Sequence, residues 1–190
     1  MPAIYVCPKS KVPESVLQLR PSHLITLLDP ADDMPTPGDF PGHRHLRLGM
    51  HDIATARPEY TAPDEMHVRE LIAFTRDWDR RQPLLIHCWA GISRSTASAF
   101  TVACMMTKPG NEQAIAQRLR KAAPHAQPNP RIVALADALL DRDGRMVDAV
   151  DAMGPGEVVF EGRLFALTLE CAKAASPATK PKPPMRSSSA

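Results

Sequence analysis

The chain has 190 residues, which is enough for one domain with a full hydrophobic core but too little for two large ones. Apolar residues make up 44% of it and charged residues 23%, the usual proportions of a globular protein. The net charge of +2 predicts neither a nucleic-acid nor a membrane partner, and no apolar run reaches the roughly 18 residues of a membrane-spanning helix.

Short apolar runs alternate with helical patterns along the chain, which predicts the α/β fold class. We expect strands at residues 4–7, 24–28, 45–48 and 84–87, the last a continuous apolar run typical of a buried central strand. We expect helices after Asp64, over residues 95–106, after Asn111, and from a cap at Asn129 to Gly144. A short helix at 145–153 and a strand within 157–169 complete the pattern.

The chain therefore reads as a single domain, residues 1–172, followed by a tail. Residues 173–190 consist largely of proline, serine, alanine and basic residues, so we expect this tail to be disordered. The first residues lack the pattern of a signal peptide, and the four cysteines show no paired spacing. We therefore expect a cytoplasmic protein with reduced thiols.

One segment carries the chemistry. It joins the end of the predicted buried strand to the start of a helix and reads His87-Cys88-Trp89-Ala90-Gly91-Ile92-Ser93-Arg94-Ser95. A loop in this position can aim successive backbone N–H groups at one point, where the helix dipole also favours negative charge. Gly91 lets the backbone approach a ligand closely, and the fork of Arg94 can bind two phosphate oxygens at once.

These residues predict a phosphate-binding loop with a reactive cysteine. Cys88 is the candidate nucleophile, and Ser95 can hydrogen-bond its sulfur and stabilise the thiolate. The phosphate-binding positions are Trp89, Ala90, Gly91, Ile92, Ser93 and Arg94.

The pattern His87-Cys88-x-x-Gly91-x-x-Arg94-Ser95 resembles the signature of the protein tyrosine phosphatase superfamily, and the short chain resembles its dual-specificity-like branch. The resemblance covers about residues 1 to 140. It implies a central, mostly parallel sheet of four or five strands, flanked by helices in three layers. It also implies a cysteinyl-phosphate mechanism without a metal or other cofactor, and a supporting role for His87 beside the cysteine.

The resemblance further implies an aspartic acid, upstream of the cysteine, that acts as a general acid. Asp52 follows the third predicted strand and is our first candidate. Asp64 is the second, although it also stands where a helix N-cap is expected. His43, His45 and His51 lie close together in the sequence and could suggest a metal site. Only His43 and His45 would share one face of a strand, and no third ligand stands at a fixed spacing from that pair, so we expect no metal.

Two other functions use similar features. A sulfurtransferase or an arsenate reductase also has a cysteine in an anion-binding loop, and a non-catalytic phosphate-binding module could keep the same fold. As substrate we expect a phosphorylated molecule. Members of the family that the motif resembles often carry lysines at the variable loop positions when they act on phosphoinositides or inositol polyphosphates, so the uncharged Trp89, Ala90, Ile92 and Ser93 favour a phosphoprotein. The sequence leaves the oligomeric state open.

Overall fold

A five-stranded sheet forms the centre of the computed structural model, which describes residues 3–32, 34–38 and 40–169. The strands are β1 (Ala3–Pro8), β2 (His23–Leu28), β3 (His45–Gly49), β4 (Leu84–Cys88) and β5 (Phe165–Thr168). They lie in the order β3-β2-β4-β1-β5, and every neighbouring pair is parallel except β1 and β5. The predicted α/β fold with a mostly parallel sheet is therefore confirmed.

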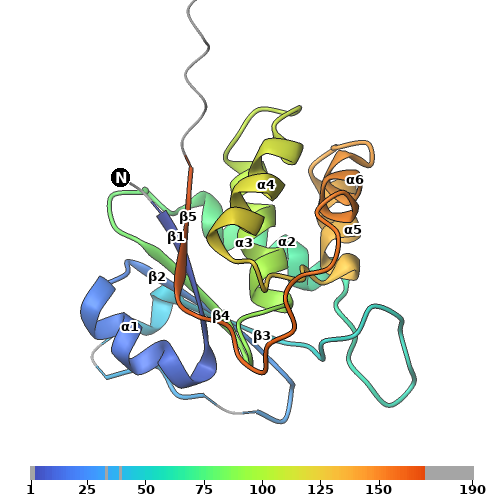
Figure 1. Cartoon of the computed structure of the whole chain (residues 1–190). Helices are drawn as coiled ribbons and strands as arrows, with labels where there is room; N and C mark the ends of the chain where they lie inside the picture. Colours follow the sequence, from blue (N-terminus) through green and yellow to red (C-terminus); the bar gives the residue numbers. More distant parts are fainter. Residues whose placement is uncertain (1–2, 33, 39, 170–190) are drawn as a thin grey trace, which may run out of the picture.

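Helices cover both faces of this sheet, which gives the predicted three layers (Figure 1). The helix α1 (Val12–Leu19) lies on one face, over a small core that includes Cys7, Leu24 and Leu85. The other face carries α2 (Glu65–Arg76), α3 (Arg94–Met105), α4 (Glu112–Ala122), α5 (Pro130–Leu139) and α6 (Arg145–Asp151). Two 3-10 turns, Lys9–Lys11 and Gly42–Arg44, precede α1 and β3.

The central strand β4 is buried along its whole length, as its apolar run predicts. The helix that follows it, α3, is buried on all sides except at its last residue, because its residues are mostly small or apolar. The strand and helix are thus fixed by the core, and so are the two ends of the loop that joins them.

The predicted helix starts at Asp64 and Asn129 are confirmed. The side chain of Asp64 caps α2, and the side-chain oxygen of Asn129 accepts the N–H groups of Arg131 and Ile132 at the start of α5.

The predicted end of that helix at Gly144 is wrong. The helix α5 ends at Leu139, and Gly144, at φ +83°, precedes the separate helix α6. The reason is Asp137, whose carboxylate leaves α5 and accepts the N–H groups of Gly144 and Met146 at 2.7 and 2.8 Å. It thereby caps the next helix and stabilises a reversal of the chain.

No helix among the described residues is long and apolar enough to cross a membrane. The predicted domain end at residue 172 and the predicted disordered tail, 173–190, lie outside the described residues.

Candidate active site

The carboxyl ends of the four parallel strands meet at one edge of the sheet. Cys88 ends β4, and its loop leads into α3. Asp29 follows β2, and Met50 and Asp52 follow β3. In open α/β sheets, ligands bind at this edge, which makes the convergence a candidate site.

The loop of residues 88–94 turns its carbonyl groups outward. Four of these carbonyl groups accept backbone N–H groups from other parts of the chain. The carbonyl of Trp89 accepts the N–H of Lys9 (3.0 Å), and that of Ala90 accepts the N–H of Gly162 (2.8 Å). The carbonyl of Ile92 accepts the N–H of Gln127 (2.9 Å), and that of Ser93 accepts the N–H of Asn129 (3.4 Å). In a planar trans peptide, the C=O and the following N–H point in opposite directions. The N–H groups of Ala90, Gly91, Ser93 and Arg94 therefore face the inside of the loop, an arrangement of the kind that can bind an anion.

The sulfur of Cys88 lies within this loop. The side chain is only 2% exposed, and its Sγ accepts the N–H of Gly91 at 3.2 Å. The hydroxyl of Ser95 lies 3.1 Å from the sulfur. The amino end of α3 starts six residues further on, so both hydrogen bonds and the helix dipole stabilise negative charge at this sulfur.

Only glycine fits at position 91. Its φ is +71°, in the left-handed region, and a Cβ there would lie 2.8 Å from the nitrogen of Pro8 and 2.9 Å from the carbonyl carbon of Cys7. Both atoms belong to the backbone of β1. The loop therefore packs directly on the end of the neighbouring strand, and this contact sets its shape.

Two partners hold the Nη1 of Arg94, whereas its Nε forms no hydrogen bond among the described residues. Its Nη1 donates to the carboxylate of Asp29 at 2.6 Å and to the carbonyl of Met50 at 2.5 Å, and the side chain is about 5% exposed. Its Nε is buried and has no hydrogen-bond partner among the described residues. A buried unpaired donor is costly, so this N–H is available for an oxygen of a bound anion.

The sequence analysis missed Asp29. The available signal was a carboxylate directly after a predicted parallel strand, at the edge where Cys88 also lies.

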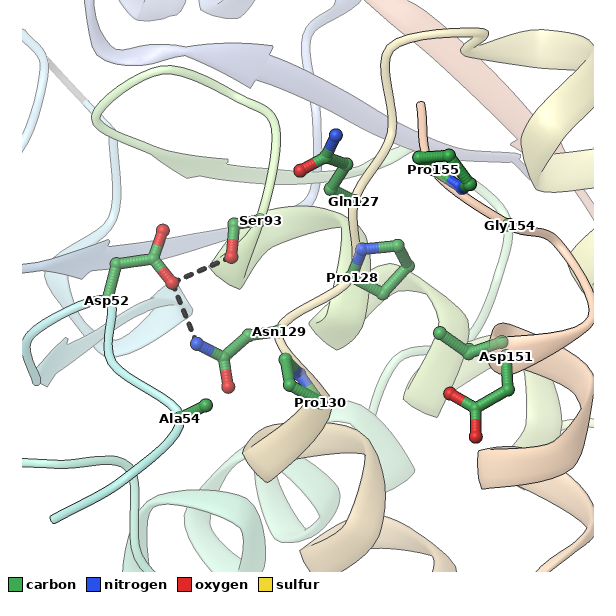
Figure 2. A pocket seen from close by; sticks show the side chains of 11 residues that line it. Asp52, Ala54, Ser93, Gln127, Pro128, Asn129, Pro130, Asp151, Gly154 and Pro155 are labelled. Atoms are coloured by element: carbon green, nitrogen blue, oxygen red, sulfur yellow. Dashed lines mark hydrogen bonds between the residues drawn. The ribbon is translucent and has the colours of Figure 1, made fainter. Parts of the chain in front are cut away.

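Asp52 lies at the rim of the loop, beside Ser93 and Asn129. Its Oδ1 accepts the hydroxyl of Ser93 at 2.7 Å and the side-chain amide of Asn129 at 2.8 Å (Figure 2). Its Oδ2 lies 3.9 Å from the Nε of Arg94. The structure thus brings the first candidate acid to the phosphate loop.

The second candidate acid lies elsewhere. The carboxylate of Asp64 accepts the backbone N–H of His67 at 3.0 Å, and the His67 ring accepts the N–H of Asp64 in return. This reciprocal pair is a capping box at the start of α2.

His87 belongs to a buried chain of hydrogen bonds behind the cysteine. Its Nδ1 donates to the carbonyl of Cys88 at 3.3 Å, so its Nε2 must accept the hydroxyl of Thr26 at 2.6 Å. The oxygen of Thr26 then accepts the Nε2–H of His45 at 2.7 Å. Burial lowers the pKa of both histidines to about 4, so the rings are neutral at physiological pH.

Two of the three histidines considered for a metal site have other roles, and the third, His43, is exposed in the turn Gly42–Arg44. His45 belongs to the chain just described, and the ring of His51 accepts the N–H of Thr61 at 3.0 Å. Within residues 3–32, 34–38 and 40–169, no three His, Cys, Asp or Glu side chains gather to hold a metal ion.

Cys88 differs from the other cysteines that the structure describes. Cys7 and Cys104 are buried without a disulfide, and burial raises the pKa of Cys7 to about 12 and that of Cys104 as well. These two thiols therefore stay protonated and packed in the core, whereas Cys88 lies among the inward N–H groups of its loop.

The segment between α6 and β5 also contacts the loop, which the sequence analysis missed. Besides the bond from Gly162 to Ala90, the ring of Phe160 lies edge-on to Trp89, with centroids 5.7 Å apart. Trp89 is 46% exposed and Phe160 is 82% exposed, so together they form an aromatic wall beside the site.

No family model matches the chain, and no curated protein matches it by sequence. Solved structures do match its fold. DUSP15 matches with a TM-score of 0.55 and 20% identity, covering 80% of this chain and 89% of its own. Human DUSP28 has a TM-score of 0.53 at 20% identity, covering 81% and 97%. The PTP-2 phosphatase of Cydia pomonella has a TM-score of 0.55 at 20% identity, covering 71% and 84%.

These neighbours include dual-specificity phosphatases, so the chain has the fold of these phosphatases. The fold that the signature motif implied is therefore confirmed.

Proposed function

We propose that this protein is a cysteine-dependent phosphatase that hydrolyses a phosphomonoester through a cysteinyl-phosphate intermediate. One observation carries the proposal: the sulfur of Cys88 accepts the N–H of Gly91 within a loop whose carbonyl groups are held outward. The loop ends at the buried Arg94, whose Nε forms no hydrogen bond among the described residues, and we place the phosphate at the point between these groups. A phosphate group at that point would place its oxygens on the N–H donors and its phosphorus next to the sulfur.

In the first step, the Cys88 thiolate attacks phosphorus. The S–P bond forms while the bond from phosphorus to the leaving oxygen breaks. Asp52 gives that oxygen a proton, so the product leaves as a neutral alcohol or phenol. Two donors already occupy Oδ1 of Asp52, so Oδ2 is the atom that carries this proton.

In the second step, water attacks the phosphorus of the intermediate. The carboxylate of Asp52 takes a proton from the water, and the S–P bond breaks with its electron pair returning to sulfur. The hydroxyl of Ser95, 3.1 Å from the sulfur, stabilises the returning thiolate. Inorganic phosphate leaves, and the enzyme returns to its starting protonation state.

Arg94 binds the phosphate throughout and stabilises the charge of its equatorial oxygens. Asp29 and the carbonyl of Met50 hold its Nη1, so the guanidinium is fixed while its Nε is left to bind the phosphate. As substrate we propose a phosphoprotein, because the side chains of the loop before Arg94 carry no charge that would attract additional phosphates.

The deciding experiment is hydrolysis of p-nitrophenyl phosphate, with and without vanadate. We expect turnover without added metal, blocked by vanadate, and lost in Cys88→Ser. A sulfurtransferase would instead consume thiosulfate, and an arsenate reductase would consume arsenate and a thiol. A binding module would bind vanadate without turnover, which would refute the proposal.

A further inference from the structure

A pocket of about 480 Å³ adjoins the phosphate loop, within the range of ligand sites in proteins. Asp52 and Ser93 join it to the loop, and Asp151, at the end of α6, lies across it with Asn129 and Pro130 between (Figure 2). We call this pocket the flanking groove. Because it begins at the candidate acid, a group bound there would be attached close to the leaving oxygen.

The charge of the flanking groove is negative. Of the described residues that line it, Asp52 and Asp151 are acidic and none is basic. The carboxylate of Asp52 is held by Ser93 and Asn129, whereas that of Asp151 is exposed and forms no described ion pair. Arg120 is not among the lining residues, and its guanidinium donates to the carbonyls of Pro124, Ala126 and Gly154.

The helix end at the groove offers no free backbone donor to an anion. The amino end of α5 faces it, and a helix N-terminus is normally a site for phosphate. Here Pro130 has no N–H, and the side chain of Asn129 already accepts the N–H groups of Arg131 and Ile132. A second phosphate would therefore meet the exposed carboxylate of Asp151 and no unpaired backbone donor at this helix.

We propose that the flanking groove binds the residue next to the phosphorylated residue of a peptide, and that Asp151 selects a basic side chain there. The proposal rests on the proposed phosphatase function and names its substrate class: a monophosphorylated peptide with a lysine or arginine beside the phosphorylated residue. The apolar floor of Pro128, Pro130 and Val150 suits the methylene stem of such a side chain.

The test uses neutral phosphotyrosine peptides in which a single lysine moves from three residues before the phosphotyrosine to three residues after it. We expect lysine at one position to raise kcat/KM about two- to fivefold over the neutral peptide, the size of an exposed ion pair. Asp151→Asn should abolish this preference, and Asp151→Lys should reverse it toward glutamate. The matched control is Asp148→Asn, which removes the same charge from an exposed position of α6 outside the groove and should keep the preference.

Hydrolysis of p-nitrophenyl phosphate, which has no flanking residue, should be the same in all four proteins. If the wild-type protein does not hydrolyse p-nitrophenyl phosphate, the phosphatase proposal fails. The groove proposal can still be tested, because the same peptides can carry a fluorescent label and their binding can be followed by fluorescence anisotropy. A peptide series without any lysine preference, a preference that survives Asp151→Asn, or a preference for a second phosphate would each overturn the inference.

Discussion

Replacing Gly91 with alanine tests whether the packing of the phosphate loop on β1 sets the geometry of the site. An alanine at φ +71° costs about 1–2 kcal/mol in backbone strain alone. Its Cβ would also lie 2.8 and 2.9 Å from backbone atoms of Pro8 and Cys7, which the sheet holds in place. Overpacking of this kind costs a further 1–3 kcal/mol, so we expect a loss of about 2–5 kcal/mol in the free energy of unfolding.

The chain can reduce this cost only by moving the loop away from β1. A shift of about 1 Å would misplace the sulfur and the N–H donors, and such a misplacement costs on the order of 100-fold in rate. We therefore expect kcat/KM for p-nitrophenyl phosphate to fall by about that factor, together with the loss of stability seen in urea denaturation.

Gly144→Ala is the matched control, because Gly144 has φ +83° but a methyl group added to it would have no neighbouring atom within 4 Å. It should lose about 1–2 kcal/mol of stability and keep its activity. If Gly91→Ala were as stable and as active as this control, the packing argument would be refuted.

Three further predictions concern the charged and titrating groups. Arg94→Lys should lower kcat/KM about 100-fold or more, because an ammonium group cannot bind Asp29 and two phosphate oxygens at the same time. A loss below about threefold would place Arg94 outside the site. Asp52→Asn should slow phosphotyrosine cleavage by about 10²–10⁴, and cleavage of an activated aryl phosphate far less, provided that formation of the intermediate limits the rate. If Asp64→Asn alone showed this pattern, Asp64 would be the acid. Finally, because the folded pKa of His87 is about 4 and the unfolded value about 6.5, its stabilising contribution is complete above pH 6.5 and is lost as the pH falls toward 4. Urea denaturation at pH 7 and 4.5 should show a decrease of roughly 2–3 kcal/mol from this residue, and His87→Gln should have a smaller pH dependence than wild type.

The position of the Cys88 loop between β4 and α3 could be predicted from the sequence because its parts are local. Residues 87–95 carry the nucleophile, the glycine, the arginine and the serine in one stretch, between a strand and a helix that their own composition specifies. The sheet could be predicted for the same reason, since its strands are short apolar runs, as in β1 and β4, or alternate apolar with other residues, as Leu46 and Leu48 do in β3.

The partners of this loop could not be predicted, because they come from remote parts of the chain. Asp29 lies 65 positions before Arg94, and only the parallel pairing of β2 with β4 brings the two ends together. The same pairing places Thr26 opposite His87, and no local pattern encodes that register.

The flanking groove was hidden for a different reason. Its outer wall, residues 150–155, contains glycine and proline and no regular apolar period, and backbone hydrogen bonds hold the segment that follows it. Such bonds leave no trace in the side-chain pattern from which sequence predictions are made. Gly144 misled the prediction because the capping carboxylate, Asp137, belongs to the preceding helix.

The central claim is that Cys88 forms a covalent bond to phosphorus, and its most direct test is to trap that intermediate. The protein is mixed with an aryl phosphate, quenched in acid within milliseconds, digested and analysed by mass spectrometry. We expect one added phosphate group on the peptide that contains Cys88, absent in Cys88→Ser and after incubation with vanadate. Turnover of the substrate with the phosphate on another residue, or undiminished turnover by Cys88→Ser, would contradict the account.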